Sequence, residues 1–361
     1  MSNPNLSKYV RITNVSGSVL PKPGIYNFDG AYATAGTDGT LLATKHFGVN
    51  LTSSANVMGM DISSKTTKPF YDAYISALNI LSNDMEYDFN LIATPGILLS
   101  LGGTDTAINA IIQKAMDVCE DRGDAFYVFD VADMATSRDA ATTVAEVVDF
   151  DTNYAAAYVG WIKVRDAVKA QDVYLPSTAV IPAVYAFNDS VGEPWFSPAG
   201  FTRGGIPEAK SMYVKYKRTQ IDTFQEGRVN PLAQFPNEGV VAWGQKTLQK
   251  RASALDRINV RRLLIELKKF VASSSKYLVF EPNVQATRTR FLSIVNPYLE
   301  LVQQRKGITG FSVVMDDTNN TDASIDRNEL KGAVYIKPAR SSEFIIIDFN
   351  VMPSGAVFDN A

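Results

Sequence analysis

Residues 237–283, NEGVVAWGQKTLQKRASALDRINVRRLLIELKKFVASSSKYLVFEPN, carry the clearest structural pattern in the 361-residue chain. The apolar run 240–243 follows a glycine and precedes a polar loop, which predicts a buried strand. Apolar residues at three- and four-residue spacing over 258–271 predict an amphipathic helix. The run 277–280, closed by Pro282, predicts a second strand. The unit is therefore strand, loop, basic helix and strand, and its simplest interpretation is an ordinary α/β unit with a solvated cationic face.

Charge is divided unevenly along the chain. Residues 240–310 contain thirteen Lys or Arg and four acidic residues, a net charge of +9. The remainder contains 22 basic and 34 acidic residues, a net charge of −12. Such a division favours an oriented contact with an acidic partner, or head-to-tail association of identical chains.

Length and composition limit the possible classes of protein. A chain of 361 residues can bury a sizeable core and is expected to hold two domains. No apolar run of about eighteen residues and no Sec-type signal pattern is found, so we expect no insertion into a membrane. Cys119 and His46 are the only residues of their types, which leaves no internal disulfide and no His-rich metal site. We therefore expect no metal and no cofactor.

The remaining elements follow from local patterns. Residues 1–65 are rich in Gly, Ser, Thr and Asn and read as an extended arm leading into short strands. From Pro69 onward, strands and helices alternate, and several strands are apolar on both faces, which indicates parallel strands covered by helices. The predicted helices are 70–81, 107–119, 137–147, 177–188 and 288–304, and the predicted strands are 89–93, 125–131, 155–164, 311–315, 333–338 and 343–351. Pro297 is expected to kink or divide the last helix.

Two groups of acidic residues in the sequence are candidate functional sites. Asp130 and Asp133 follow a predicted parallel strand at its carboxyl end, where α/β enzymes often place active sites. However, no phosphate-binding glycine loop follows any strand, and no His or Cys partner is evident, so catalysis there is the weaker interpretation. The loop 316–322 lacks the glycine and the bidentate glutamate of a calcium loop, so we expect a solvated loop.

The loop 194–205, PWFSPAGFTRGG, combines prolines, glycines and aromatic residues. This composition predicts a rigid connection anchored by its aromatic side chains. A ligand site and an inter-domain clamp both fit the pattern. As candidate anchors between two domains we select Trp195, Phe196, Phe201 and Trp243.

Several motifs in a fixed order identify a resemblance. They are PWFSPAG at 194–200 with Arg203 and Gly204, VVAWG at 240–244, INVRRL at 258–263, VFEPN at 279–283, and Glu343 with Phe344. With these motifs the chain resembles the contractile tail sheath proteins of bacteriophages and phage-tail-like particles. The likeness is most specific over residues 190–350, weaker over 70–165 and poor in the first 65.

The resemblance implies an α/β fold with a subtilisin-like parallel-sheet central domain that lacks a catalytic triad, a smaller α+β C-terminal domain facing the tail tube, and extended terminal arms. The corresponding ranges are 1–30 for the N-terminal arm, 31–235 for the central domain, 236–345 for the C-terminal domain and 346–361 for the C-terminal arm. Many sheath proteins are longer, with an inserted surface domain. The chain is therefore expected to be a compact sheath, a fragment, or one of two sheath polypeptides.

The implied function is structural, not enzymatic. Such subunits polymerise as a helix or as stacked rings around the tail tube of a virion and contract to drive the tube through the target envelope for genome ejection. The implied partners are other copies of the chain, the tail tube protein, and baseplate and tail terminator proteins, without nucleic acid. Assembly in the bacterial host cytoplasm and a final place in the virion tail are expected. The alternatives are the sheath of a type VI-like injection system, an α/β hydrolase using Asp130 and Asp133, and a nucleic-acid-binding protein using the basic segment.

The resemblance also gives residues a role. The candidates for facing the tube are Arg261, Arg262, Lys268, Lys269, Arg288 and Arg290. The candidates for a strand exchanged between subunits are Phe344, Ile345, Ile346, Ile347, Phe349 and Val351, whose β-branched and aromatic content suits such pairing. The alternative, that 343–351 is an internal strand of its own domain, is equally compatible with the sequence.

Overall fold

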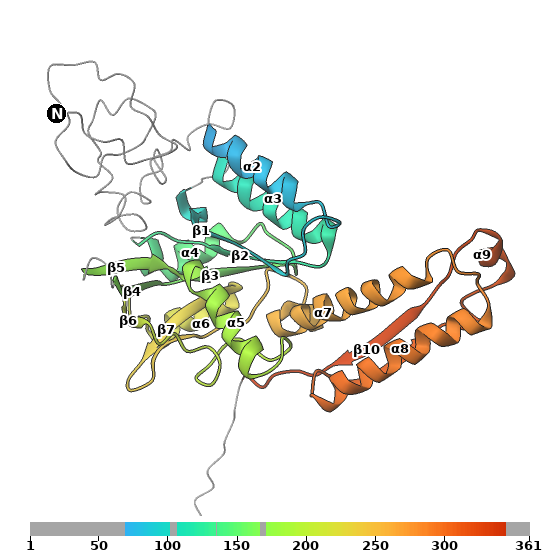
Figure 1. Cartoon of the computed structure of the whole chain (residues 1–361). Coiled ribbons are helices and arrows are strands. Elements are labelled where there is room, and N and C mark those ends of the chain that lie inside the picture. The colour runs from blue at the N-terminus through green and yellow to red at the C-terminus, as the bar shows by residue number, and fades with distance from the viewer. Residues whose placement is uncertain (1–68, 102–106, 135, 167–170, 344–361) are drawn as a thin grey trace, which may run out of the picture.

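The computed structural model describes residues 69–101, 107–134, 136–166 and 171–343, and they form two lobes (Figure 1). The larger, central lobe is built on a five-stranded sheet with the strand order β1-β2-β3-β7-β8. Its strands are β1 (Leu91–Leu98), β2 (Phe126–Asp130), β3 (Ala155–Val159), β7 (Val229–Phe235) and β8 (Gly239–Ala242). The first four are parallel, and β8 pairs antiparallel with β7. The predicted parallel sheet is thereby confirmed.

Apolar cores cover both faces of this sheet. Tyr127 and Phe129 of β2 point into one core, and the alternating Phe126 and Val128 point into the other. The first core is closed by helices α2 (Pro69–Leu81), α3 (Ala107–Arg122), α4 (Ala140–Glu146) and α6 (Arg218–Glu226). The second is closed by α5 (Ile181–Val191) and by the first turns of α7 (Ile258–Ser275). Strands buried on both faces explain the continuous apolar runs in the sequence.

The stretch 155–164, predicted as one strand, is two strands in different sheets. Gly160, at φ 136°, separates β3 from β4 (Trp161–Asp166). Strand β4 is the centre of an antiparallel three-stranded sheet with β5 (Gln171–Pro176) and β6 (Ala209–Met212). A Cβ at Gly160 would lie 2.9 Å from the Cβ of Leu232, so both the backbone angle and the available space require glycine.

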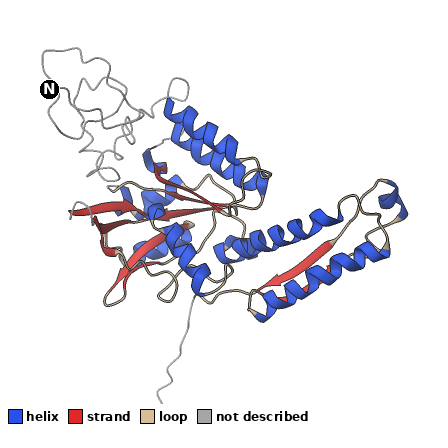
Figure 2. Ribbon diagram, viewed as in Figure 1, coloured by secondary structure: helices blue, strands red, loops and turns tan. Residues whose placement is uncertain are grey.

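The C-terminal lobe consists of two long helices and a two-stranded ribbon (Figure 2). Helix α7 is followed by α8 (Gln285–Gln304), β9 (Ile308–Val314), the short α9 (Asp322–Asp326) and β10 (Ala333–Pro338). Strands β9 and β10 pair antiparallel, and apolar residues of α7, α8 and the ribbon form a third core. Helix α7 thus contributes to two cores, with Ile258 and Ile265 toward the central sheet and Leu263 and Leu267 toward the C-terminal lobe.

One prediction for this lobe is wrong. Residues 277–280 form no strand: a 3-10 turn, η6 (Lys276–Leu278), leads into Phe280 at φ 69°, where the chain reverses between α7 and α8. No described strand lies beside this run to receive its hydrogen bonds. Of the two effects expected of Pro297, division does not occur: α8 continues through it, with Val295 and Leu299 on either side buried in the same core.

Two helices begin later than predicted. The region 177–188 is a 3-10 turn, η4 (Ser177–Ala179), followed by α5, in which Pro182 lies in the first turn, where proline is tolerated. The region 137–147 is η3 (Thr136–Arg138) followed by α4, whose first turn is capped by Asp139.

The β7–β8 hairpin belongs to one sheet, so the expected domain boundary after residue 235 would divide it. The expected arms, His46 and residues 344–351 lie outside the described residues.

Candidate assembly site at the lobe junction

Trp195 joins the two lobes. Its side chain is 7% exposed and packs among the residues of the C-terminal core, although the residue follows α5 of the central lobe. The indole Nε1 donates a hydrogen bond to the Arg305 carbonyl at 3.0 Å. A Cβ on Gly307 would come within 3.1 Å of the ring, so the glycine makes room for the indole. Phe196 is half-buried against the same core.

Phe201 and Trp243 lie elsewhere. Phe201 is 49% exposed and packs against Phe235 and Trp243 of the central lobe, with ring centroids 5.1 Å away in each case. Phe235 and Trp243 are themselves 4.6 Å apart. The prediction that Phe201 is a buried inter-domain anchor is therefore wrong. The reason is that the loop turns after Gly200, whose N–H binds the Ala242 carbonyl, so its second half follows the β7–β8 hairpin.

A polar cluster ties the end of the described chain to the same junction. Glu343 accepts two hydrogen bonds from Arg257, at 2.6 Å from Nε and 2.8 Å from Nη2, and one from Gln245 Nε2 at 3.1 Å. Asn259 Nδ2 donates to the Trp195 carbonyl at 3.4 Å and to Ser341 Oγ at 3.2 Å. The sequence gives no sign of this cluster, because nothing in the spacing links position 257 to position 343.

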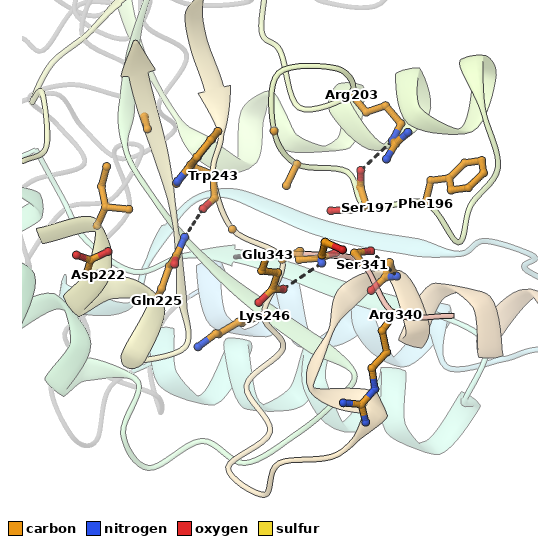
Figure 3. Close-up of a pocket in the computed structure, with 18 of the residues that line it drawn as sticks. Phe196, Ser197, Arg203, Asp222, Gln225, Trp243, Lys246, Arg340, Ser341 and Glu343 are labelled. Atoms are coloured by element: carbon orange, nitrogen blue, oxygen red, sulfur yellow. Dashed lines mark hydrogen bonds between the residues drawn. The ribbon is translucent and has the colours of Figure 1, made fainter. Parts of the chain in front are cut away.

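A cleft of about 970 Å³ opens between these contacts (Figure 3). Its lining comes from the loop 194–205, helix α6, the β7–β8 hairpin and the segment 339–343. Lys246 also lines it, and burial lowers the pKa of its amine, with Arg257 lowering it further and Glu343 opposing the change. The cleft therefore combines aromatic surface with charged groups of both signs.

Three of the six basic residues expected to face a tube are buried, so that prediction is wrong for them. Arg261 is 3% exposed and its guanidinium lies 3.4 Å from the centroid of the Tyr154 ring, where burial lowers its pKa. Arg262 is 9% exposed and pairs with Asp189 at 2.5 Å. Arg288 is 3% exposed and pairs with Asp317. Periodicity assigned Arg261 and Arg262 to a solvated face, but arginine stems and planar guanidinium groups pack well against aromatic rings.

The other three basic candidates remain at the surface. Lys268 is exposed and donates to the Tyr154 hydroxyl at 3.1 Å. Lys269 is half-buried and binds Asp88 at 2.6 Å. Arg290 is exposed and forms no ion pair with another residue of the described ranges. These three side chains can present positive charge to a partner.

Asp130 and Asp133 are engaged inside the central lobe. Asp130 is 2% exposed and accepts hydrogen bonds from Ser177 Oγ at 2.5 Å, from the Thr178 N–H at 3.0 Å and from the Thr178 hydroxyl. Burial raises its pKa to about 6, and these hydrogen bonds oppose the rise. Asp133 is 7% exposed and caps the turn at the Thr136 N–H, 2.6 Å away. Both carboxylates hold turns in place by hydrogen bonds at strand ends, and neither lines the cleft.

The described ranges hold no cluster of three or more His, Cys, Asp or Glu residues arranged to bind a metal. Across the same part of the chain, no helix has the length and apolar character needed to span a membrane. In the loop after β9, Asp316 Oδ1 accepts from the Thr318 N–H at 2.9 Å, so this acidic loop is shaped by its own side chains.

Comparison with known protein families identifies the class to which the chain belongs. The model of the phage tail sheath protein central domain matches residues 64–248, and that of the phage tail sheath C-terminal domain matches residues 251–352. The chain belongs to the phage tail sheath protein family. This confirms the resemblance seen in the sequence motifs.

Two relatives that match the chain are also tail sheath proteins. The tail sheath protein of Vibrio phage KVP40 is 31% identical over 354 residues, which cover 96% of this chain and 49% of the relative. The tail sheath protein of Enterobacteria phage T4 is 39% identical over 186 residues, covering 52% of this chain and 28% of the relative. The chain thus spans about half the length of the KVP40 protein and less of the T4 protein.

Solved structures share the fold. The sheath complex of an extracellular contractile injection system (PVC), in its contracted state, has a TM-score of 0.61 at 24% identity, with 76% of this chain and 74% of that chain covered. The contracted helical sheath of the anti-feeding prophage has a TM-score of 0.60 at 21% identity, covering 80% and 76%. At such identities the likeness establishes the fold alone.

Proposed function

We propose that this chain is a structural subunit of a contractile tail sheath, which polymerises around a tail tube and shortens to drive the tube through a target envelope. The observation that carries the proposal is that matches to the two sheath domain families together extend over both lobes. The subunit would act without catalysis or a cofactor, in the tail of a virion assembled in the host cytoplasm. Baseplate, tail terminator and tube proteins would be its partners besides other copies of itself.

The finer fold description is part of this proposal. A subtilisin-like central domain is supported by the parallel order β1-β2-β3-β7 with helices on both faces. The terminal segments 1–30 and 346–361 would be arms that reach neighbouring subunits. A sheath in a contractile injection system is a second candidate, favoured by the fold shared with the PVC and anti-feeding prophage sheaths.

The ribbon of the C-terminal lobe is a suitable receiver for a neighbour's strand. It has two strands in the described chain, so each has one edge without a strand partner there. Unpaired edges readily accept an added strand, which contributes main-chain hydrogen bonds. Tyr335 of β10 is 63% exposed, which leaves apolar surface for the incoming side chains. Residues 344–351 of a neighbouring subunit supply the β-prone sequence.

Lys268, Lys269 and Arg290 are the remaining candidates for contact with the tube. Attraction between exposed charges is long-ranged and weakened by salt, so it can hold a tube without burying apolar surface. Reversing Lys268 and Arg290 to Glu is expected to reduce assembly on an acidic tube, and raised salt is expected to do the same to the unaltered protein. Assembly unaffected by either change would contradict this role.

Electron microscopy of the purified full chain tests the proposal. Tubular polymers, formed alone or on a tube, are expected, and deletion of residues 344–361 should give a folded, soluble subunit that forms none. Circular dichroism of both proteins checks that the described fold is retained. A monodisperse full-length protein that never polymerises with a tube, or that shows hydrolytic turnover lost in Asp130→Asn, would refute it.

A further inference from the structure

An aromatic patch at the edge of the cleft, two of whose three rings line it, is left partly uncovered. The patch consists of Phe201, Phe235 and Trp243, whose ring centroids lie 4.6 to 5.1 Å apart. Phe201 is 49% exposed and the other two are half-buried. Trp243 and Phe235 line the same cleft as Glu343 (Figure 3). Three adjoining aromatic rings form a strong apolar docking surface, and the fold of the central lobe does not require them to be exposed.

The chain leaves the described fold inside this cleft. Glu343 is held there by Arg257 and Gln245, and Gln245 is only two residues from Trp243. An extended chain advances about 3.3 Å per residue, so a few residues after Glu343 are enough to reach the patch. The exit point and the patch are therefore neighbours because of the fold.

Two hydrogen-bond acceptors at the exit have no partner among the described residues. They are Gln245 Oε1 and Asn259 Oδ1, both buried beside the cleft. The orientation of each amide is set by its other atom: Gln245 Nε2 donates to Glu343 and Asn259 Nδ2 to Ser341 Oγ. Buried acceptors are normally satisfied, and the backbone N–H groups of a peptide segment could do so here.

The residues that follow have the chemistry of an occupant. Residues 344–351, FIIIDFNV, are mostly apolar and strongly β-prone. Such a segment exposed on a free subunit would promote aggregation. We propose that in the free subunit residues 344–351 fold back into the subunit's own cleft, cover the aromatic patch and satisfy the two acceptors. Their release to a neighbour during assembly, which rests on the proposed function, would make cleft opening the step that controls polymerisation.

The tryptophans provide a direct test in the full chain. Trp161 and Trp195 are 2% and 7% exposed, so Trp243 is the indole most open to a quencher. With 344–351 in the cleft, acrylamide quenching of dilute full-length protein should be weak. The double variant Ile345→Asp, Ile347→Asp should show a several-fold rise in the quenching constant. Deletion of 352–361 keeps the proposed occupant and should leave quenching unchanged.

A second measurement does not depend on truncation or loss of fold. Asp222 is exposed and lines the cleft, and the native Cys119 is buried, so an engineered pair Asp222→Cys, Ile346→Cys should form one disulfide within a single chain, independent of protein concentration. A cross-link that joins two chains, or protection of Trp243 that is lost on dilution, would assign the cleft to a second copy and overturn the proposal. Equal quenching of the double variant and the parent protein would overturn it too.

Assembly is scored separately, by electron microscopy of the same variants. A double variant with raised quenching that still builds normal sheaths would support the fold-back contact while refuting the exchanged strand of the proposed function. Unchanged quenching with failed assembly would refute the fold-back contact while supporting the exchanged strand. The two ideas can therefore fail independently.

Discussion

Replacing Trp195 by Ala should measure how much the lobe junction contributes to the stability of the protein. The indole is 7% exposed, packs against the C-terminal core and donates one hydrogen bond to the Arg305 carbonyl. Truncation of a buried aromatic side chain costs about 3–5 kcal/mol of unfolding free energy. Trp195→Phe keeps most of the ring but loses the hydrogen bond, so a smaller loss of about 1–2 kcal/mol is expected.

Urea unfolding followed by far-ultraviolet circular dichroism measures both losses, because it does not depend on the tryptophan removed. Phe201→Ala is the matched control: it removes a ring from the same loop that is 49% exposed, so about 1 kcal/mol is expected from its aromatic contacts. The Trp195→Ala variant should also lose the C-terminal lobe first, seen as a separate early transition. Equal losses for Trp195→Ala and Phe201→Ala would refute the reasoning.

Three further outcomes follow from buried and paired groups. Burial raises the pKa of Asp130 from 3.8 to about 6, so the stability that this group contributes below pH 4 is lost as pH rises through 6. The expected loss of unfolding free energy is about 3 kcal/mol. Asp130→Asn should abolish this dependence of the unfolding free energy on pH, measured from pH 4 to 7. Burial also raises the pKa of the Cys119 thiol to about 12, so a thiol reagent at pH 8 should label it in urea but not in the native protein. For Arg257 and Glu343, whose side chains are 27% and 26% exposed, a double-mutant cycle should give a coupling of about 1 kcal/mol that weakens in high salt; a coupling of zero would show that the pair does not fix the chain exit.

The sequence predicts most of the central sheet because its signals are local. Strand β2 is apolar at consecutive positions and bounded by turn residues, so a short window is enough to identify it. The run 277–280 is equally apolar but has no strand neighbour in the described part of the chain, and pairing depends on residues far along the sequence. Chain-wide motifs identified the family, since they are longer than chance allows.

The candidate site was less predictable. Arg261 and Arg262 read as a charged helix face, and only the fold shows that Tyr154 and Tyr185 cover them. The contact between Arg257 and Glu343 joins positions 86 residues apart, and no pattern in either segment predicts it. Trp195 and Phe201 lie in one loop with the same composition around them, yet one is buried and the other half-exposed because the loop turns between them.

The single glycine between β3 and β4 also limits where this chain can change in length. Gly160 passes the chain from one sheet to another with no intervening loop, and its positive φ and its contact with Leu232 leave no room for a side chain. An inserted residue here would shift the register of both sheets at once. Gly160 is therefore expected to be a position at which this chain tolerates neither substitution nor insertion.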